Sequence, residues 1–306
     1  MTDLPILHHF DSSPFSEKVR LMFGLKDLAW GSVKIPNMMP KPDYTPLTGG
    51  YRRTPSLQIG ADIYCDSQMI LAEIERRWPE PRAVRGGLDW AINLWADRPF
   101  FQATVPIIFG TIGDQTPEAF LKDREQLSGR PFDVKAMKAA VGPMKGQWRG
   151  QAAWLEDQLA QSASGWLNGD TAGLADIAAY MNVWFLSGAL PPALAELTAG
   201  MPKLGDWAKR VAAIGHGRPT QMTGAEALAI AKSTAPATGL THDIMDPLGL
   251  APGDRVVVMA DDYGRDPVSG TLVAATPRGV TLARDDAAVG TVHVHFPRAG
   301  YIAVAG

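Results

Sequence analysis

The sequence contains a single cysteine, Cys65, among 306 residues. No disulfide can therefore form within the chain, a cysteine-rich metal site is excluded, and a reducing compartment is expected. Long hydrophobic runs are also missing: no stretch reaches the ~18 apolar residues of a membrane-spanning helix, and no basic segment followed by an apolar run opens the chain. We therefore expect a cytoplasmic protein without a membrane segment.

Neither sign of charge is in large excess, because 29 basic and 32 acidic residues give a net charge of −3. This balance excludes a general attraction to nucleic acid or to anionic membranes, and it favours small neutral or acidic ligands. The length exceeds the usual domain size of ~100–150 residues, so two or three domains are expected.

Residues 1–83 mix the strand period and the helix period, which predicts an α/β domain. Gly60-Ala61 marks a tight turn, so the two strands around it should pair as a hairpin. The predicted order is strand 4–10, helix 15–25, a proline-rich loop 35–50, strand 56–59, strand 62–65 and helix 67–78.

From residue 88 to 232 the strand signals disappear, which predicts an all-α domain. The run 174–190 is apolar on nearly every side but too short for a membrane span, so we expect it to be the central buried helix. The predicted helices are 88–110, 117–127, 133–141, 147–161, 174–188, 203–214 and 223–233.

Residues 233–243 have the composition of a linker, and residues 245–306 then predict a third domain, a small antiparallel β-barrel of SH3-like type. Its predicted strands are 255–259, 270–274, 280–284, 289–296 and 301–304. An excess of acidic over basic residues argues against RNA binding, so we expect this domain to dock onto the helices or onto a protein partner. His293 and His295 share one strand face, but no third ligand is evident, so we expect surface histidines and no metal.

The run Ser12-Ser13-Pro14-Phe15-Ser16 stands between the first strand and the first helix. It has the layout of Cys-Pro-x-Cys with hydroxyls in place of thiols, so it can form no disulfide. Pro14 suits the first helical position, and the free amides and positive dipole end of a helix N-terminus favour an anion. The run excludes electron transfer but suits holding the thiolate of a substrate.

Two interpretations of Ser13 are open. A hydroxyl bond to a charged group contributes ~1.5–3 kcal/mol and the dipole ~0.3–1 kcal/mol, which would lower the pKa of a bound thiol from ~8.5 to about 6 or 7. Alternatively, Ser13 only caps the helix. Ser12 is the second candidate for the thiol, whereas Ser16 lies a turn into the helix and is expected to be partly buried.

Two further motifs each have a functional and a purely structural interpretation. In Thr54-Pro55, a cis peptide bond would turn the Thr54 backbone toward an extended peptide, whereas a trans bond would only begin an edge strand. Asp66-Ser67 at a helix start either caps that helix or holds the ammonium and carboxylate of an α-amino-acid head group.

Together these motifs resemble the glutathione transferase superfamily over residues 4–232. Ser-Pro-Phe-Ser-Glu-Lys-Val-Arg at 13–20, Thr54-Pro55, Asp66-Ser67 and Glu-Arg-Arg-Trp-Pro-Glu-Pro at 75–81 follow its thioredoxin-like N-terminal domain in order and spacing. Gly169-Asp170 with Leu174-Ala175-Asp176 resembles the helix-capping motif of its all-α C-terminal domain.

The resemblance implies a role for each motif. Ser13 would activate the thiol of glutathione, Thr54 with Pro55 would bind its cysteinyl backbone, and Asp66 with Ser67 would hold its γ-glutamyl head group. The glycine carboxylate would meet Lys41, Arg52 or Arg53, with Arg53 retained among the binding residues. A small electrophile would lie between the two domains. The aromatic residues Trp95, Phe100, Phe101 and Phe109 are candidates for its wall, but an aromatic helix face is more often part of the core, so we do not count them as site residues.

The predicted function is a cytoplasmic, homodimeric glutathione transferase-like enzyme, with glutathione as co-substrate and no metal. The alternative is a non-enzymatic binding or assembly protein that keeps the fold and uses the C-terminal barrel for partner contacts. Three features depart from the family: glycine at 173 where the capping motif usually has Ser or Thr, the long loop 35–50, and the β-rich region after residue 245.

Overall fold

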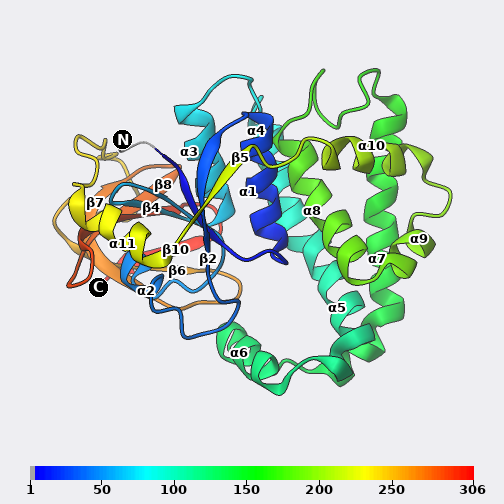
Figure 1. Cartoon of the computed structure of the whole chain (residues 1–306), viewed down its shortest axis with the longest axis horizontal. Coiled ribbons are helices and arrows are strands. Elements are labelled where there is room, and N and C mark those ends of the chain that lie inside the picture. Colours follow the sequence, from blue (N-terminus) through cyan, green and yellow to red (C-terminus); the bar gives the residue numbers. More distant parts are fainter. Residues whose placement is uncertain (1–3) are drawn as a thin grey trace.

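The computed structural model describes residues 4–306, so the first three residues of the predicted domain 1–83 lie outside the described part. Figure 1 shows most of the helices on one side of the molecule and the C-terminal strands on the other, with the N-terminal strands and α1 between them. The division into domains 1–83, 88–232 and 245–306 stays a prediction.

The N-terminal domain has the expected thioredoxin-like arrangement of strands and helices. Its strands follow the order β2-β1-β3-β4, in which β1 is parallel to β2 and antiparallel to β3. The strand β2 falls where no strand was predicted. The elements are β1 (Ile6–His9), α1 (Pro14–Leu25), β2 (Ala29–Lys34), α2 (Thr45–Thr48), β3 (Ser56–Ile59), β4 (Asp62–Cys65) and α3 (Ser67–Arg77).

The helical domain packs on α1 and α3 through one continuous apolar core. α8 is its buried centre, as the apolar run predicts, with Leu174, Ile177 and Met181 fully covered. The elements are α4 (Gly87–Trp95), a π-helical turn η1 (Ala96–Phe100), α5 (Phe101–Ile112), a 3₁₀ turn η2 (Gly113–Gln115), α6 (Glu118–Ser128), α7 (Val134–Gln161), α8 (Leu174–Ala189), α9 (Pro191–Leu197) and α10 (Pro202–Ala212).

The break predicted between 141 and 147 is wrong, because α7 is one helix that contains Pro143. Proline removes one helical hydrogen bond, but packing against a neighbour can outweigh that loss. α5 supplies such a neighbour: a Cβ on Gly110 would lie 2.5 Å from the carbonyl oxygen of Met137, so glycine lets the two helices approach closely.

Gly173 caps α8 through its backbone. The Gly173 amide donates to the Asp176 carboxylate at 3.0 Å, and the amide of Leu174 donates to the Ala83 carbonyl at 2.9 Å. A Cβ at position 173 would lie 2.7 Å from that same Ala83 oxygen. Glycine therefore stands where the family usually has Ser or Thr because the linker between the domains passes directly over this position.

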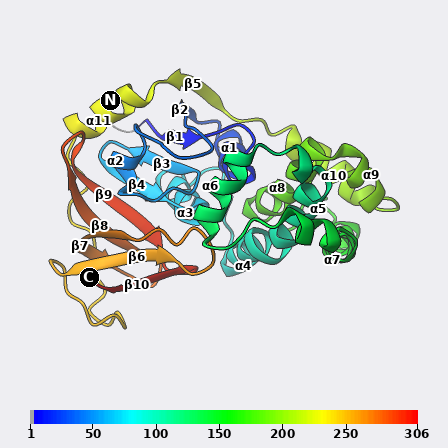
Figure 2. The ribbon, with the colours of Figure 1, turned by 90° about the horizontal axis from the view of Figure 1, so that it is seen from below.

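The segment after α10 returns to the N-terminal sheet rather than staying with the helices. β5 (Arg218–Met222), which was not predicted as a strand, lies parallel to β2, and α11 (Gly224–Ser233) covers β1 and β2 through Ala227. Figure 2 shows this segment running back over the N-terminal strands.

The C-terminal region is antiparallel, as predicted, and its strands occur at the predicted places. They are β6 (Arg255–Ala260), β7 (Val268–Ala275), β8 (Gly279–Asp286), β9 (Gly290–Pro297) and β10 (Tyr301–Ala305). β9 pairs in parallel with β4, so one sheet runs β10-β6-β7-β8-β9-β4-β3-β1-β2-β5. This pairing extends the N-terminal sheet, and it does not identify the region as an SH3-like barrel.

The expectation of surface histidines in β9 is wrong, because pairing with β4 buries both. His295 donates from Nε2 to Asp62 of β4 at 2.8 Å, and its ring stacks on Tyr64 with centroids 4.4 Å apart. Burial opposes ionisation of Asp62, but the His295 hydrogen bond and charge, with the Ala237 amide, lower its pKa overall. Among residues 4–306, no group of three or more side chains has the arrangement of a metal site.

Across the described range 4–306, no helix is both long enough and apolar enough to cross a membrane.

Candidate functional site

A cavity of about 470 Å³ lies where the N-terminal domain, the helical domain and the C-terminal region meet. Its polar lining includes Ser12, Ser13, Thr54, Asp66 and Ser67. Seven phenylalanines also line it: Phe10, Phe15, Phe101, Phe109, Phe120, Phe132 and Phe185. The predicted binding residues Arg53 and Lys41 also line the cavity, whereas Pro55 is buried outside it.

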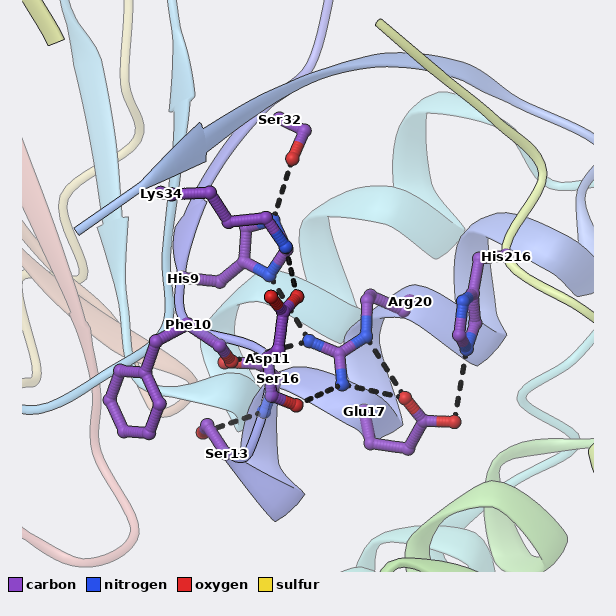
Figure 3. A network of polar contacts seen from close by, with 10 residues as sticks. All are labelled: His9, Phe10, Asp11, Ser13, Ser16, Glu17, Arg20, Ser32, Lys34 and His216. Carbon is purple, nitrogen blue, oxygen red and sulfur yellow. Dashed lines mark hydrogen bonds and ion pairs between the residues drawn. The ribbon is translucent and has the colours of Figure 1, made fainter. Parts of the chain in front are cut away.

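Ser13 is the N-cap of α1, and Pro14 is the first residue of that helix, as the sequence pattern predicts. Its Oγ accepts a hydrogen bond from the Ser16 amide at 3.2 Å (Figure 3). Because Oγ serves as the acceptor in this bond, the hydroxyl proton is left to donate to a ligand. Ser12 is exposed at the same turn, and Ser16 is fully buried and does not line the cavity.

Arg20 holds the turn that presents Ser13 (Figure 3). Its guanidinium donates to the Asp11 carbonyl at 3.0 Å, to His9 Nδ1 at 3.1 Å and to the Glu17 carboxylate at 2.7 and 2.9 Å. Burial opposes ionisation of Glu17, but hydrogen bonds from His216 and Arg20 lower its pKa overall. The buried guanidinium of Arg20 thereby ties the turn before Ser13 to β1 and to helix α1.

The peptide bond between Thr54 and Pro55 is cis, which is the geometry that the functional interpretation of this motif required. The Thr54 hydroxyl accepts from Lys41 Nζ at 3.1 Å, and the Arg52 carbonyl accepts from the same ammonium at 2.9 Å. Burial, followed by the charge of Arg124, lowers the pKa of Lys41 to about 8.

Asp66 caps α3 with its carboxylate, which accepts from the Gln68 amide at 2.9 Å. Its backbone has φ +73°, a left-handed conformation that costs a non-glycine residue about 1–3 kcal/mol and that occurs mainly at functional sites. The second carboxylate oxygen accepts from the Tyr301 hydroxyl at 3.0 Å. Ser67 follows as the first helical residue, buried at the cavity wall.

Most charged side chains around the cavity are paired within the protein. The ion pairs of these lining residues are Lys18–Asp97, Arg52–Asp123, Arg53–Asp262, Arg98–Asp261 and Arg124–Asp123. Lys41 and Asp66 are the exceptions, since within residues 4–306 neither has an ion-pair partner. One cavity thus holds an anion and a cation that each lack a direct ion-pair partner in the described part of the chain.

Of the four aromatic residues named as candidates for the wall, two line the cavity and two do not. Phe101 and Phe109 line the cavity, whereas Phe100 is fully buried and stacks on Trp95 at 5.0 Å between centroids, which is the core role. The π-helical turn η1 accounts for the difference, because it breaks the regular spacing between residues 95 and 101.

Sequence reasoning missed the lining residues from η1 and from the C-terminal region. These are Asp97, Arg98, Asp262, Tyr263, Ala299, Gly300 and Tyr301. The Asp262-Tyr263-Gly264 run had the composition of a turn, but no local signal connects it with Arg53, more than two hundred residues earlier.

Comparisons with known proteins identify the family. A model of the glutathione S-transferase N-terminal domain matches residues 7–82, and a model of the C-terminal domain matches residues 138–210. A GST-like protein from Pseudomonas syringae has 35% identity and a TM-score of 0.81, and the match covers 100% of both chains. The chain belongs to the glutathione S-transferase superfamily.

Other glutathione S-transferases match with lower identity and show the shared fold. One from Rhodospirillum rubrum is 19% identical with a TM-score of 0.53, covering 68% of this chain and 87% of its own. One from Methylobacterium radiotolerans, solved in complex with glutathione sulfonate, is 22% identical with a TM-score of 0.50, covering 72% and 97%. Among curated proteins, none matches the chain.

Proposed function

We propose that this chain binds glutathione and lowers the pKa of its thiol, so that the thiolate attacks a small electrophile. The observation that carries the proposal is the pair of uncompensated charges, Asp66 and Lys41, in the cavity that also contains Ser13. Glutathione has an ammonium group at its γ-glutamyl end, a carboxylate at its glycine end and a thiol between them. Its charge pattern therefore complements the cavity.

Each residue has a role in this proposal. Asp66 accepts from the γ-glutamyl ammonium, and the Ser67 hydroxyl donates to the adjacent α-carboxylate. Lys41 is the favoured partner of the glycine carboxylate, because Arg52 and Arg53 already bind Asp123 and Asp262. Thr54, whose hydroxyl accepts from Lys41, suits the cysteinyl backbone.

Ser13 acts on the thiol. The thiol releases its proton to solvent, and the Ser13 hydroxyl donates to the resulting thiolate at the positive end of α1. The sulfur then shares an electron pair with the electrophilic carbon, while the leaving group departs with the pair that bound it. The seven phenylalanines of the cavity wall favour an apolar, aromatic electrophile.

Calorimetric titration with glutathione tests the binding part of the proposal, and a pH titration of the bound thiol tests the activation part. Binding with a thiol pKa well below that of free glutathione is the expected result. Binding with an unshifted thiol pKa would instead support the alternative of a non-enzymatic binding or assembly protein. No binding at millimolar glutathione would contradict both.

We also retain the homodimer and the cytoplasmic location as predictions that follow from the superfamily and from the sequence. Sedimentation of the purified chain tests the first of these, and fluorescence microscopy of a tagged chain tests the second.

A further inference from the structure

Two segments of the C-terminal region reach the cavity and hold each other in place. One follows β6 and contains Asp261 to Gly264, and the other is Gly300–Tyr301 at the start of β10. The Asp261 amide donates to the Gly300 carbonyl at 3.0 Å. A Cβ on Gly264 would lie 2.9 Å from Leu127 of α6 and 3.0 Å from Arg53, so this segment fits tightly between the N-terminal domain and the helices.

A chain of hydroxyl groups connects this region to Asp66. The hydroxyls of Tyr51 and Tyr301 lie 3.0 Å apart, and Tyr301 donates to Asp66 Oδ2, also at 3.0 Å. Since the Tyr301 proton is directed to Asp66, Tyr51 is the donor in the first bond. The Gln68 amide fixes the other oxygen, Oδ1. Both oxygens of the Asp66 carboxylate are therefore held, each by one neutral donor.

Neutral donors orient this carboxylate without cancelling its charge. A carboxylate has about four lone-pair sites, and the two donors occupy two of them. The remaining sites are available to a ligand, and the full negative charge favours a cationic donor. An ammonium group placed there binds strongly, whereas a ligand that lacks it leaves the carboxylate without a charged partner in the cavity.

We propose that Tyr301 is a positioning residue that fixes Asp66 and thereby makes the site selective for thiol peptides with a free α-ammonium group. This inference rests on the proposed function and assigns to the C-terminal strands a part in substrate recognition. Residues 245–306 accordingly belong to the binding site.

The test compares two peptides that differ only in the ammonium group. They are S-methylglutathione and S-methyl-glutaryl-cysteinyl-glycine, in which hydrogen replaces the α-amino group. Affinities are measured by calorimetry at pH 7 for the wild type and for the variants Tyr301→Phe and Asp66→Asn. Tyr180→Phe is the matched control, because Tyr180 is a mostly buried tyrosine of α8 that does not line the cavity.

The wild type should prefer S-methylglutathione by at least tenfold. Tyr301→Phe should weaken S-methylglutathione about tenfold and leave the glutaryl peptide unchanged, so that the preference disappears; Asp66→Asn should also abolish it. In the double variant that combines Tyr301→Phe and Asp66→Asn, the two losses of affinity should be far from additive, because both substitutions act on the Asp66 carboxylate. Tyr180→Phe should retain the wild-type preference.

Two results would overturn the inference while leaving glutathione binding intact. In one, Tyr301→Phe weakens both peptides equally, which is the mark of a general structural role. In the other, the variant keeps the wild-type preference. If the wild type binds neither peptide, the proposed function itself fails, so the two failures are distinguishable.

Discussion

Lys41 and Asp66 illustrate how the lack of an ion-pair partner gives single residues their function. Each is a charged group in a shared cavity with only neutral partners among residues 4–306: Lys41 contacts a carbonyl and a hydroxyl, and Asp66 an amide and a phenol. The cost of desolvating Lys41 appears as its pKa of about 8, well below the ordinary value of a lysine. A ligand carboxylate would restore the missing counter-charge.

The affinity for S-methylglutathione should therefore fall as the pH rises above 8. The free protein loses the Lys41 proton through its pKa of about 8, and only the protonated ammonium pairs with a carboxylate. Binding above this pH must take up a proton, so affinity should fall up to about tenfold per pH unit. In Lys41→Arg the guanidinium stays charged, and the fall should shift to the higher pH at which the ligand's own ammonium titrates. Calorimetry between pH 7 and 9.5 would measure this; identical pH profiles for both proteins would contradict the role of Lys41.

At this scale, local sequence singled out residues that the structure gathers in one cavity, and their roles stay predictions. Ser13, Thr54, Asp66 and Ser67 were identified because each sits at a helix start or a strand start, whose geometry depends on a few neighbouring residues. Tyr301 escaped prediction because it lies 235 positions after Asp66, and no local signal connects the two residues.

Among the elements, β1 carries two buried neutral histidines. Burial lowers the pKa of His8 to about 4, and burial with the charges of Lys34 and Arg20 lowers that of His9 to about 3. His9 Nδ1 accepts from Arg20, which assigns its proton to Nε2 and to the bond with Ser32 at 2.9 Å. Protonation of His9 would break this arrangement.

The free energy of unfolding should consequently decrease as the pH falls below 6.5. The unfolded chain binds protons on these histidines near pH 6.5, whereas the folded chain does so only near pH 3 to 4. At pH 5 each histidine should cost about 2 kcal/mol relative to pH 7. Urea unfolding of wild type and His9→Gln at pH 5 and pH 7 measures the loss of unfolding free energy between the two pH values. This loss should be about 2 kcal/mol smaller in the variant. An equal loss of unfolding free energy in both proteins would exclude His9 as a source of this pH dependence.

The elements also show where sequence periodicity fails. β2 and β5 were missed because their pairing with β1 and with each other, rather than their short sequences, makes them strands. The predicted break in α7 reflected Pro143 and ignored the close packing against Gly110 of α5. The five C-terminal strands were predictable because each is a short run of residues that favour strands and is bounded by turn residues.

For the whole molecule, the C-terminal region is a continuation of the N-terminal sheet. β9 pairs with β4, and Val256, Val258 and Val294 share one buried core with Leu47 and Ile63 of the N-terminal domain. The sequence could not reveal this, since a separate barrel and a sheet extension have the same strand pattern. Some residues of the C-terminal region pack in this shared core, and others line the cavity.

Truncation after Ser233 should therefore destabilise the remaining chain. It would expose Leu47, Ile63 and Cys65, which are fully buried in the intact protein. Exposing large apolar side chains costs about 1.5–3 kcal/mol each, a substantial part of the 5–15 kcal/mol that stabilises a typical protein. Thermal unfolding and solubility of the truncated chain would show a lower midpoint or aggregation. A soluble truncated chain with an unchanged midpoint would contradict the shared core.

The thiol pKa of bound glutathione, followed by thiolate absorbance during a pH titration, tests the role of Ser13 most directly. The matched variants are Ser13→Ala, which removes both hydroxyl and cap, Ser13→Gly, which loses only a few tenths of a kcal/mol as a cap, and Ser12→Ala. We predict a bound thiol pKa of about 6 to 7 in the wild type and in Ser12→Ala, and a rise of about one to two units in both Ser13 variants. A thiol pKa that is unshifted in the wild type, or unchanged by either Ser13 substitution, would contradict activation by Ser13 and leave this residue as a helix cap.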